Sequence, residues 1–328
     1  MTTPARLLAL DAGMGTTDIL VFEPDGRPEN SVKLVVPSRT RIVAGQIRDA
    51  TRRGLPVVFA GPTMGGGPST KAMLAHLAAG LSFWATETAA LSYADRLEWA
   101  TDRGVRLVSD DEVTGLRRSG AVEVRSGDVD LDGLLRALAD LGAPTAFTGG
   151  CIAAQDHGFD PHGSNRVLRF QMWERALAAR TPLEELFYAA DEVPAELTRL
   201  RAAAGELAAL PQVTAADTGP AALLGALGDD TTDAVLVNVG NCHTICAVAL
   251  EGRLAGIYED HTNRLDGPTL ESYVRRFLAG ALPVLVTGPQ RELLARSSLP
   301  VCFPAPFGDV MMTGPAGLIR AHRRRYGV

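Results

Sequence analysis

Lysine is nearly missing from this chain of 328 residues, which has a formal net charge of −6 at pH 7. Only Lys33 and Lys71 are lysines, and the other basic residues are arginines. Binding along a nucleic-acid backbone needs a basic face that neutralises phosphates. The acidic balance therefore argues against general nucleic-acid binding, and the one basic cluster, residues 320–325, has the pattern of a helix end.

Cysteines and long apolar runs are scarce as well. The four cysteines are too few and too widely spread for a disulfide framework, which predicts reduced thiols. They are Cys151, Cys242, Cys246 and Cys302. The apolar run near the start is interrupted by Asp11 and is too brief for a signal peptide or a membrane span. We therefore expect a cytoplasmic protein.

The composition is that of a globular enzyme. Hydrophobic residues make up 46% of the chain and charged residues 21%, and the 34 glycines fit many tight turns. The length exceeds the usual size of a single core, so two domains are expected. We place the first at residues 1–230 and the second at 231–328.

The sequence contains two similar hairpins, about 220 residues apart. Residues 7–22 and 234–250 both predict a strand, a turn of small residues and a second strand. The turns, residues 11–17 and 238–244, contain Gly, Asn and Thr, which allow sharp bends and present bare N–H and hydroxyl groups to an anion. Two such turns predict facing loops that grip one polyphosphate from both sides.

The rest of the chain alternates predicted strands and helices. After the first hairpin we expect a third strand at 32–36, a helix near 42–50 and a parallel strand at 57–60. Residues 61 to about 210 predict an α/β insertion. The second half repeats the theme, with these further elements expected: a strand at 253–258, a helix at 268–278, a strand at 284–286, a helix at 290–295, a strand at 310–312 and a last helix from about 316 to 325.

Two further segments lie on either side of the second turn in the sequence. Residues 217–227 form a predicted small-residue helix before the second turn, and residues 313–318 precede the last helix. With the two turns, in this order, they resemble the phosphate loops, first connecting helix and adenosine motif of the actin, sugar kinase and Hsp70 ATPase superfamily. Residues 15–18 are also similar to the hydantoinase and oxoprolinase branch. The resemblance implies an α/β fold of two ribonuclease H-like domains with an interdomain nucleotide cleft.

The whole chain is also similar to an uncharacterised bacterial and archaeal family labelled pyruvate formate-lyase-activating-enzyme-like. The markers are residues 65–68, 155–158 and 260–262. A radical enzyme of that kind needs three thiolates spaced Cys-x3-Cys-x2-Cys to hold an iron–sulfur cluster. Cys242 and Cys246 supply the first spacing, but position 249 is Ala249, so no cluster and no radical chemistry are expected.

The superfamily resemblance implies ATP and Mg²⁺ as ligands. Asp11 would serve Mg²⁺, while Gly314 and Gly317 would let adenosine approach. The phosphates would contact both turns, through Gly13, Gly15, Thr16, Thr17, Asn238, Gly240, Asn241, His243 and Thr244.

Each of these roles has a structural alternative. Asp11 could instead accept turn N–H groups, and the threonines could bond within the turn. Asn238 stands where the superfamily usually has Asp, so it brings no charge to a metal. His243 either donates to a phosphate or caps the turn.

The polar, glycine-rich segment 148–166 has the composition of a functional loop. Within it, Asp156 is predicted to be a base and His157 its neighbour in the site; the alternative is a solvated loop capping the next helix. Asp217 either caps a helix or positions a water near the γ-phosphate. The predicted catalytic residues are Asp156, His157 and Asp217, and the predicted substrate contacts are Gly65, Gly66, Gly67, His162, Arg166, Asp260 and His261.

The glycines at 65–67 follow a strand and open a helix, which suits an anionic group at a helix N-terminus. They lack the ending of a P-loop and the spacing of a Rossmann turn, so we expect them to bind substrate or line the cleft.

These observations predict an ATP-binding phosphotransferase that acts on a small metabolite, with domain closure excluding water. The alternative is a nucleotide-dependent regulatory or activator ATPase whose closure is recognised by a partner protein, which Asn238 favours. A minor alternative is a metal-dependent hydrolase, in which Asp156, His157, Asp260 and His261 would converge on a divalent ion. No nucleic-acid or membrane partner is expected, and the oligomeric state is left open.

Overall fold

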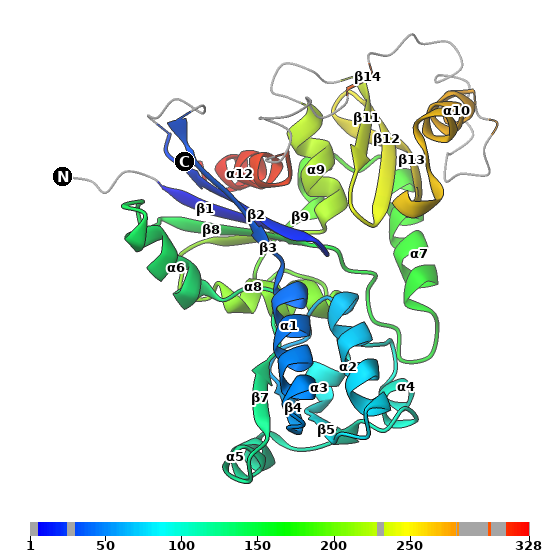
Figure 1. Cartoon of the computed structure of the whole chain (residues 1–328). Helices are drawn as coiled ribbons and strands as arrows, with labels where there is room; N and C mark the ends of the chain where they lie inside the picture. The colour runs from blue at the N-terminus through cyan, green and yellow to red at the C-terminus, as the bar shows by residue number, and fades with distance from the viewer. Residues whose placement is uncertain are drawn as a thin grey trace.

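The computed structural model describes residues 6–24, 30–227, 233–279, 281, 301–302 and 313–327. This part of the chain has an α/β fold, as the sequence predicts, and its strands form three sheets (Figure 1). Of the helices in these ranges, none combines the length and apolar character that a bilayer span requires.

The first sheet has six strands in the order β3-β2-β1-β8-β10-β9. β1, β2 and β3 form an antiparallel meander, β8 runs parallel to β1, and β10 runs parallel to β8. All six residues of β8 are buried, as expected for a central parallel strand that is covered on both faces. The strands are β1 (Leu7–Ala12), β2 (Thr16–Phe22), β3 (Val32–Pro37), β8 (Gly149–Ala154), β9 (Phe187–Ala189) and β10 (Val213–Ala216).

The second sheet has the order β13-β12-β11-β14 and also begins with an antiparallel meander. β14 runs parallel to β11. Its strands are β11 (Ala234–Val239), β12 (His243–Leu250), β13 (Arg253–His261) and β14 (Val301–Cys302). One face is covered by α10 (Gly267–Leu278), through Val274 and Phe277. The predicted elements at 284–286, 290–295 and 310–312 lie outside the described residues.

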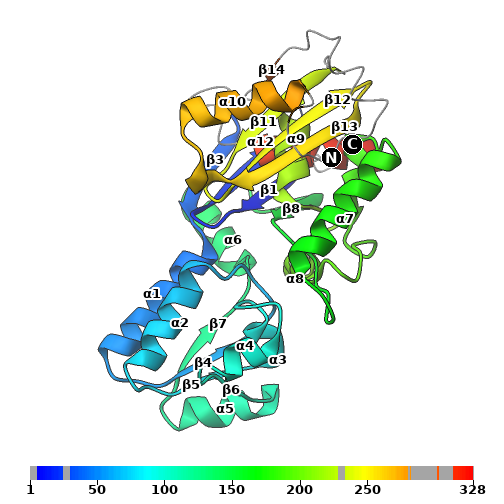
Figure 2. The same cartoon turned by 90° about the vertical axis from the view of Figure 1, so that its right-hand side faces the viewer.

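The third sheet is entirely parallel, in the order β6-β5-β4-β7. Figure 2 shows it, with its helices, as a body hanging below the other two sheets. Its strands are β4 (Val57–Ala60), β5 (Phe83–Ala85), β6 (Arg106–Leu107) and β7 (Val122–Arg125), and its helices are α1 (Arg39–Arg52), α2 (Pro68–Ala78), α3 (Glu87–Ala90), α4 (Leu97–Thr101) and α5 (Asp110–Arg118).

The third sheet and its helices span residues 39–125, whereas the predicted insertion runs from 61 to about 210. The predicted strand at 57–60 forms as β4, but it belongs to this sheet, and β8 takes the place beside β1. The segments that follow residue 125 return to the first sheet; they include α6 (Leu131–Asp140), α7 (Asn165–Ala178), η2 (Leu183–Leu186) and α8 (Thr198–Glu206). The domain division at residue 230 stays a prediction.

Two helices join the first two sheets. α9 (Thr218–Leu227) and α12 (Thr313–Tyr326) pack on each other, and their Leu223 and Leu318 share one core with Leu7 of β1 and Leu236 of β11. α12 also contacts β1 and β8, so the end of the chain returns to the first sheet (Figure 1). A single apolar core therefore packs against both hairpins.

Gly317 permits the close approach of these helices. A Cβ at Gly317 would overlap the Ala221 carbonyl oxygen and lie 2.8 Å from the Gly225 nitrogen. Both are backbone atoms and cannot rotate away. We expect Gly317→Ala to lower the free energy of unfolding by about 2–3 kcal/mol, measured by urea denaturation.

Gly205 in α8 provides the matched control, since no atom lies within 4 Å of a Cβ built there. Gly205→Ala is expected to raise stability by up to about 1 kcal/mol through helix propensity. Equal stability of the two variants would show that α9 and α12 are not in close contact.

Candidate functional site

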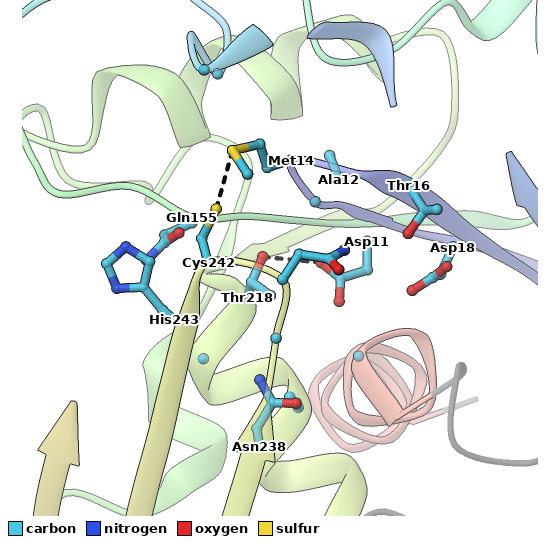
Figure 3. Close-up of a pocket in the computed structure, with 18 of the residues that line it drawn as sticks. Asp11, Ala12, Met14, Thr16, Asp18, Gln155, Thr218, Asn238, Cys242 and His243 are labelled. Carbon is cyan, nitrogen blue, oxygen red and sulfur yellow. Dashed lines mark hydrogen bonds between the residues drawn. The ribbon is translucent and has the colours of Figure 1, made fainter. Parts of the chain in front are cut away.

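Both hairpin turns line one cavity of ≈ 800 Å³. Asp11, Gly13 and Thr16 come from the first hairpin, and Asn238 and Gly240 from the second (Figure 3). Other predicted residues on its wall are Asn241, His243, Gly314, His157, Gly65, Gly66 and Gly67. The volume is that of a typical small-ligand site.

The two turns have the same hydrogen-bonding pattern. Gly13 N donates to Thr16 O at 3.0 Å, and Gly240 N donates to His243 O at 2.9 Å. These two amides close their turns, so they are not the ones that face a ligand. The amides of the two residues after each glycine have no hydrogen-bond partner within the described ranges; they belong to Met14, Gly15, Asn241 and Cys242.

The turns also touch each other. A Cβ at Gly15 would lie 2.8 Å from Nδ2 of Asn241, and the Cys242 thiol lies 3.1 Å from the Met14 sulfur (Figure 3). The loops therefore face each other, with no room for a side chain at Gly15.

Several predicted nucleotide contacts lie elsewhere. Thr17 is buried, and Thr244 is fully buried, with its hydroxyl 3.1 Å from that of Thr262. Gly317 packs against α9. Gly314 does line the cavity, where it packs against Asp11. Among the threonines predicted to bind phosphate, only Thr16 lines the cavity.

Two carboxylates stand side by side on the cavity wall. Asp11 and Asp18 are directly opposed in the β1–β2 ladder, and both line the cavity. Asp11 Oδ1 accepts a hydrogen bond from the Thr218 hydroxyl at 2.9 Å, whereas Asp18 Oδ1 is buried with no partner among the described residues. Burial raises the pKa of Asp11 to about 7 and that of Asp18 to about 6. A cation beside these two carboxyl groups would lower both pKa values and favour their ionised forms.

Asp18 escaped the sequence prediction, although the hairpin register would have revealed it. If Gly13 and Thr16 close the turn, residue 18 must face residue 11 on the neighbouring strand. The described residues hold no group of three or more His, Cys, Asp or Glu side chains placed to bind a metal. Two carboxylates alone suit Mg²⁺, which commonly binds one or two carboxylates together with substrate phosphates.

Asp156 and Asp217 are fully engaged and do not line the cavity. The Asp156 carboxylate accepts from Gly158 N at 2.8 Å and Leu200 N at 2.9 Å. Asp217 accepts from Asp156 N at 2.8 Å and Gly219 N at 2.9 Å, and it also pairs with Arg169. These contacts make Asp217 a helix cap, one of its two predicted roles, and Asp156 an anchor for the loop after β8. The predicted base role of either residue stays a prediction.

A buried ion-pair network, missed by sequence reasoning, links Asp217 to the second turn. Arg169 of α7 lies between Asp217 at 2.9 Å and Glu259 of β13 at 3.0 Å, and Glu259 lies 2.9 Å from Nδ1 of His243. Burial alone would raise the pKa of Glu259, but the hydrogen bond from His243 and the charge of Arg169 lower it to about 2. Burial alone would lower the pKa of Arg169, but Asp217 and Glu259 raise it well above its ordinary value.

Three histidines lie in a row beside this network. The ring centroids of His157 and His243 are 5.5 Å apart, and those of His243 and His261 are 4.6 Å apart. Burial, and next the charge of Arg169, lower the pKa of His157 to about 4. Arg166 contacts His261 at 3.1 Å, whereas His162 is exposed.

The proposed metal set of Asp156, His157, Asp260 and His261 does not form among the described residues. Asp156 is held by backbone amides, and Asp260 accepts a hydrogen bond from the Tyr258 hydroxyl at 3.1 Å. The geometry therefore gives the metal-hydrolase alternative no support.

The glycines before α2 bring the inserted sheet to the cavity. Gly65, Gly66 and Gly67 line it, and so does Arg199 of α8, whose guanidinium would be 2.7 Å from a Cβ at Gly65. Arg199 pairs with Asp128 at 2.7 Å and also donates to Gln155 O at 2.7 Å. Sequence reasoning missed Arg199, because an arginine within a helix pattern normally indicates a solvated face.

Comparison with known proteins finds one family whose model matches residues 64–285, more than half of the chain. The family is described as "Putative pyruvate format-lyase activating enzyme (DUF1786)". No curated protein matches the chain.

Proposed function

The chain belongs to this family, and we propose that its activity is the transfer of the γ-phosphoryl group of ATP to a small metabolite. One observation carries the proposal. Two turns with the same hydrogen-bonding pattern, from two different sheets, meet at one cavity whose wall also carries two partly buried carboxylates.

The radical chemistry suggested by the family description does not fit the residues. An iron–sulfur cluster of that type needs three thiolates. Cys246 is fully buried in β12, where burial raises its pKa to about 12, and Cys242 sits on the turn. Ala249 takes the third position of the motif. These residues cannot supply the ligand set.

The sheet topology supports the superfamily likeness. Both β3-β2-β1-β8 and β13-β12-β11-β14 place an antiparallel meander next to a parallel strand, and α9 and α12 connect them. This repeated order is what two ribonuclease H-like domains with an interdomain nucleotide cleft would have. Active-site chemistry is a separate question, because the fold alone does not establish it.

The groups on the cavity wall are of the chemical types that bind Mg²⁺–ATP. The unpaired amides of the two turns and the Thr16 hydroxyl would donate to phosphate oxygens. Asp11 and Asp18 would hold Mg²⁺, which when bound neutralises phosphate charge. Gly314 lines the same cavity beside Asp11.

Asn238 favours a second candidate function. It lines the cavity at the place where the resemblance leads us to expect a carboxylate, so the second turn contributes no acidic side chain there. A nucleotide-dependent regulatory ATPase that signals to a partner protein would tolerate this loss better than a phosphotransferase. The rate of ADP release distinguishes the two. A small metabolite should stimulate it if the protein is a phosphotransferase, and a protein partner should stimulate it if the protein is a regulatory ATPase.

Calorimetry of ATP binding tests the proposal. The wild type is expected to bind ATP at one site in the presence of Mg²⁺, and Asp11→Asn is expected to weaken binding at least about tenfold, the factor that 1.4 kcal/mol represents. Asp49→Asn, on the exposed side of α1, is the control and should bind as the wild type does. Absence of nucleotide binding to the wild type, with all common nucleoside triphosphates tried, would overturn the proposal.

A further inference from the structure

We propose that His243 is the base that takes the proton from the phosphoryl acceptor, that Glu259 is its positioning residue, and that the acceptor group is a hydroxyl. The inference rests on the proposed function and adds to it a catalytic residue and the chemical class of the substrate.

His243 has the placement that a base requires. It starts β12 at the end of the second turn and lines the cavity (Figure 3). Its Nδ1 lies 2.9 Å from the Glu259 carboxylate, and Nε2 has no hydrogen-bond partner among the described residues. A carboxylate at Nδ1 fixes the tautomer that carries its proton there, which leaves the Nε2 lone pair free to accept one.

Glu259 is itself held rigidly. Its side chain is 6% exposed, and its second oxygen accepts from Arg169 Nε at 3.0 Å and Trp173 Nε1 at 3.3 Å. Both oxygens are therefore occupied, one by the imidazole and one by α7. Such support fixes the orientation of the base and stabilises the imidazolium that forms after proton transfer.

The other polar groups near the cavity are less suited to the task. Asp156 and Asp217 do not line the cavity, and backbone amides occupy their oxygens. His157 lines it, but burial and Arg169 make it a weak base. Asp11 and Asp18 form the cation site.

The balance of the reaction identifies the acceptor class. The acceptor O–H bond breaks and its proton goes to Nε2 of His243, while the oxygen forms a bond to the γ-phosphorus. The bond from that phosphorus to the β,γ-bridging oxygen breaks, and ADP leaves with the electron pair. A carboxylate or phosphate acceptor is already ionised at neutral pH and needs no base, whereas a hydroxyl does.

The test measures ADP release and ATP affinity for the wild type, His243→Gln, His243→Asn and Glu259→Gln. Acceptors are glycerol and glucose as hydroxyl compounds, and acetate as a carboxylate. We expect stimulation by a hydroxyl compound and none by acetate. His243→Gln should lower kcat roughly 10²- to 10⁴-fold while the Kd for MgATP changes less than about threefold. His243→Asn serves if the glutamine variant fails to fold, and Glu271→Gln on the surface of α10 is the control for Glu259→Gln.

A pH profile of kcat separates positioning from a structural role. The groups that face His243 are Glu259 and His261 of β13, His157, and Arg169 behind Glu259. The wild type should show an acid limb, which His243→Gln abolishes. Glu259→Gln should lower kcat with little change in the Kd for MgATP, because the imidazole loses the carboxylate that fixes its orientation.

Four results would count against the inference. Loss of MgATP affinity by His243→Gln in proportion to kcat would make His243 a phosphate contact and overturn the base role. Phosphorylation of acetate with no stimulation by either hydroxyl compound would overturn the acceptor class. A wild type that binds no MgATP would overturn the proposed function itself, and a wild type that binds MgATP but keeps the same pH limb in His243→Gln would overturn only this inference.

Discussion

Replacing Arg169 with methionine is expected to lower the free energy of unfolding by about 3–5 kcal/mol. The substitution keeps an apolar stem of similar length but leaves two buried carboxylates, Asp217 and Glu259, without their cation. The side chains of Arg169 and Glu259 are each 6% exposed and that of Asp217 is 11% exposed, so water cannot replace the lost partner.

Urea denaturation at pH 8 measures the effect. The control is Arg275→Met on α10, because Arg275 pairs with Glu271 and both side chains are more than half exposed. That variant is expected to change stability by less than about 1 kcal/mol. Similar losses in the two variants would mean that the network does not hold α7 to β13.

Asp11→Asn is expected to stabilise the nucleotide-free protein at pH 8 by roughly 2–4 kcal/mol. Burial raises the pKa of Asp11 from 3.8 to about 7, and each unit is worth about 1.4 kcal/mol. Asn keeps an oxygen that can accept from Thr218, so the hydrogen bond at 2.9 Å survives.

The pH dependence gives this prediction its sign. Between about pH 4 and 7 the folded protein retains a proton on Asp11 that the unfolded chain has released. Wild-type stability should therefore fall as pH rises through this window, and the advantage of Asp11→Asn should be largest above pH 7 and nearly gone at pH 4. Urea denaturation without divalent cations, with Asp49→Asn as control, measures it. A stability difference that does not vary with pH would contradict the raised pKa of Asp11.

Local patterns were sufficient to predict the two hairpins. The strands alternate around short turns of small residues, and the turn geometry at Gly13 and Gly240 follows from adjacent residues alone. The register of β1 with β2 follows from the same turn, so even the Asp11–Asp18 pair was accessible to sequence reasoning.

The extent of the inserted sheet could not be predicted from local sequence patterns. β4 and β8 are both short, buried and apolar, and nothing local states that β4 pairs with β7 while β8 pairs with β1, more than 130 residues earlier in the chain. Pairing over such separations is decided by tertiary packing.

The site was predictable where turns and glycine-rich loops carry it. Glu259, Arg169 and Arg199 are charged residues within a strand and two helices, where sequence alone predicts solvated faces. Their partners come from other elements, so their burial depends on the assembled fold. Asp156 and Asp217, in contrast, lie in motif-like segments, but their carboxylates accept hydrogen bonds from backbone amides.

The structure of the protein with Mg²⁺ and a non-hydrolysable ATP analogue is the most direct test of the nucleotide site. We expect the triphosphate in the cavity between the two turns, hydrogen-bonded to the amides that follow Gly13 and Gly240, with Mg²⁺ near Asp11 and Asp18. An analogue bound on another surface, with this cavity empty of nucleotide and both carboxylates without a metal, would contradict the proposed site.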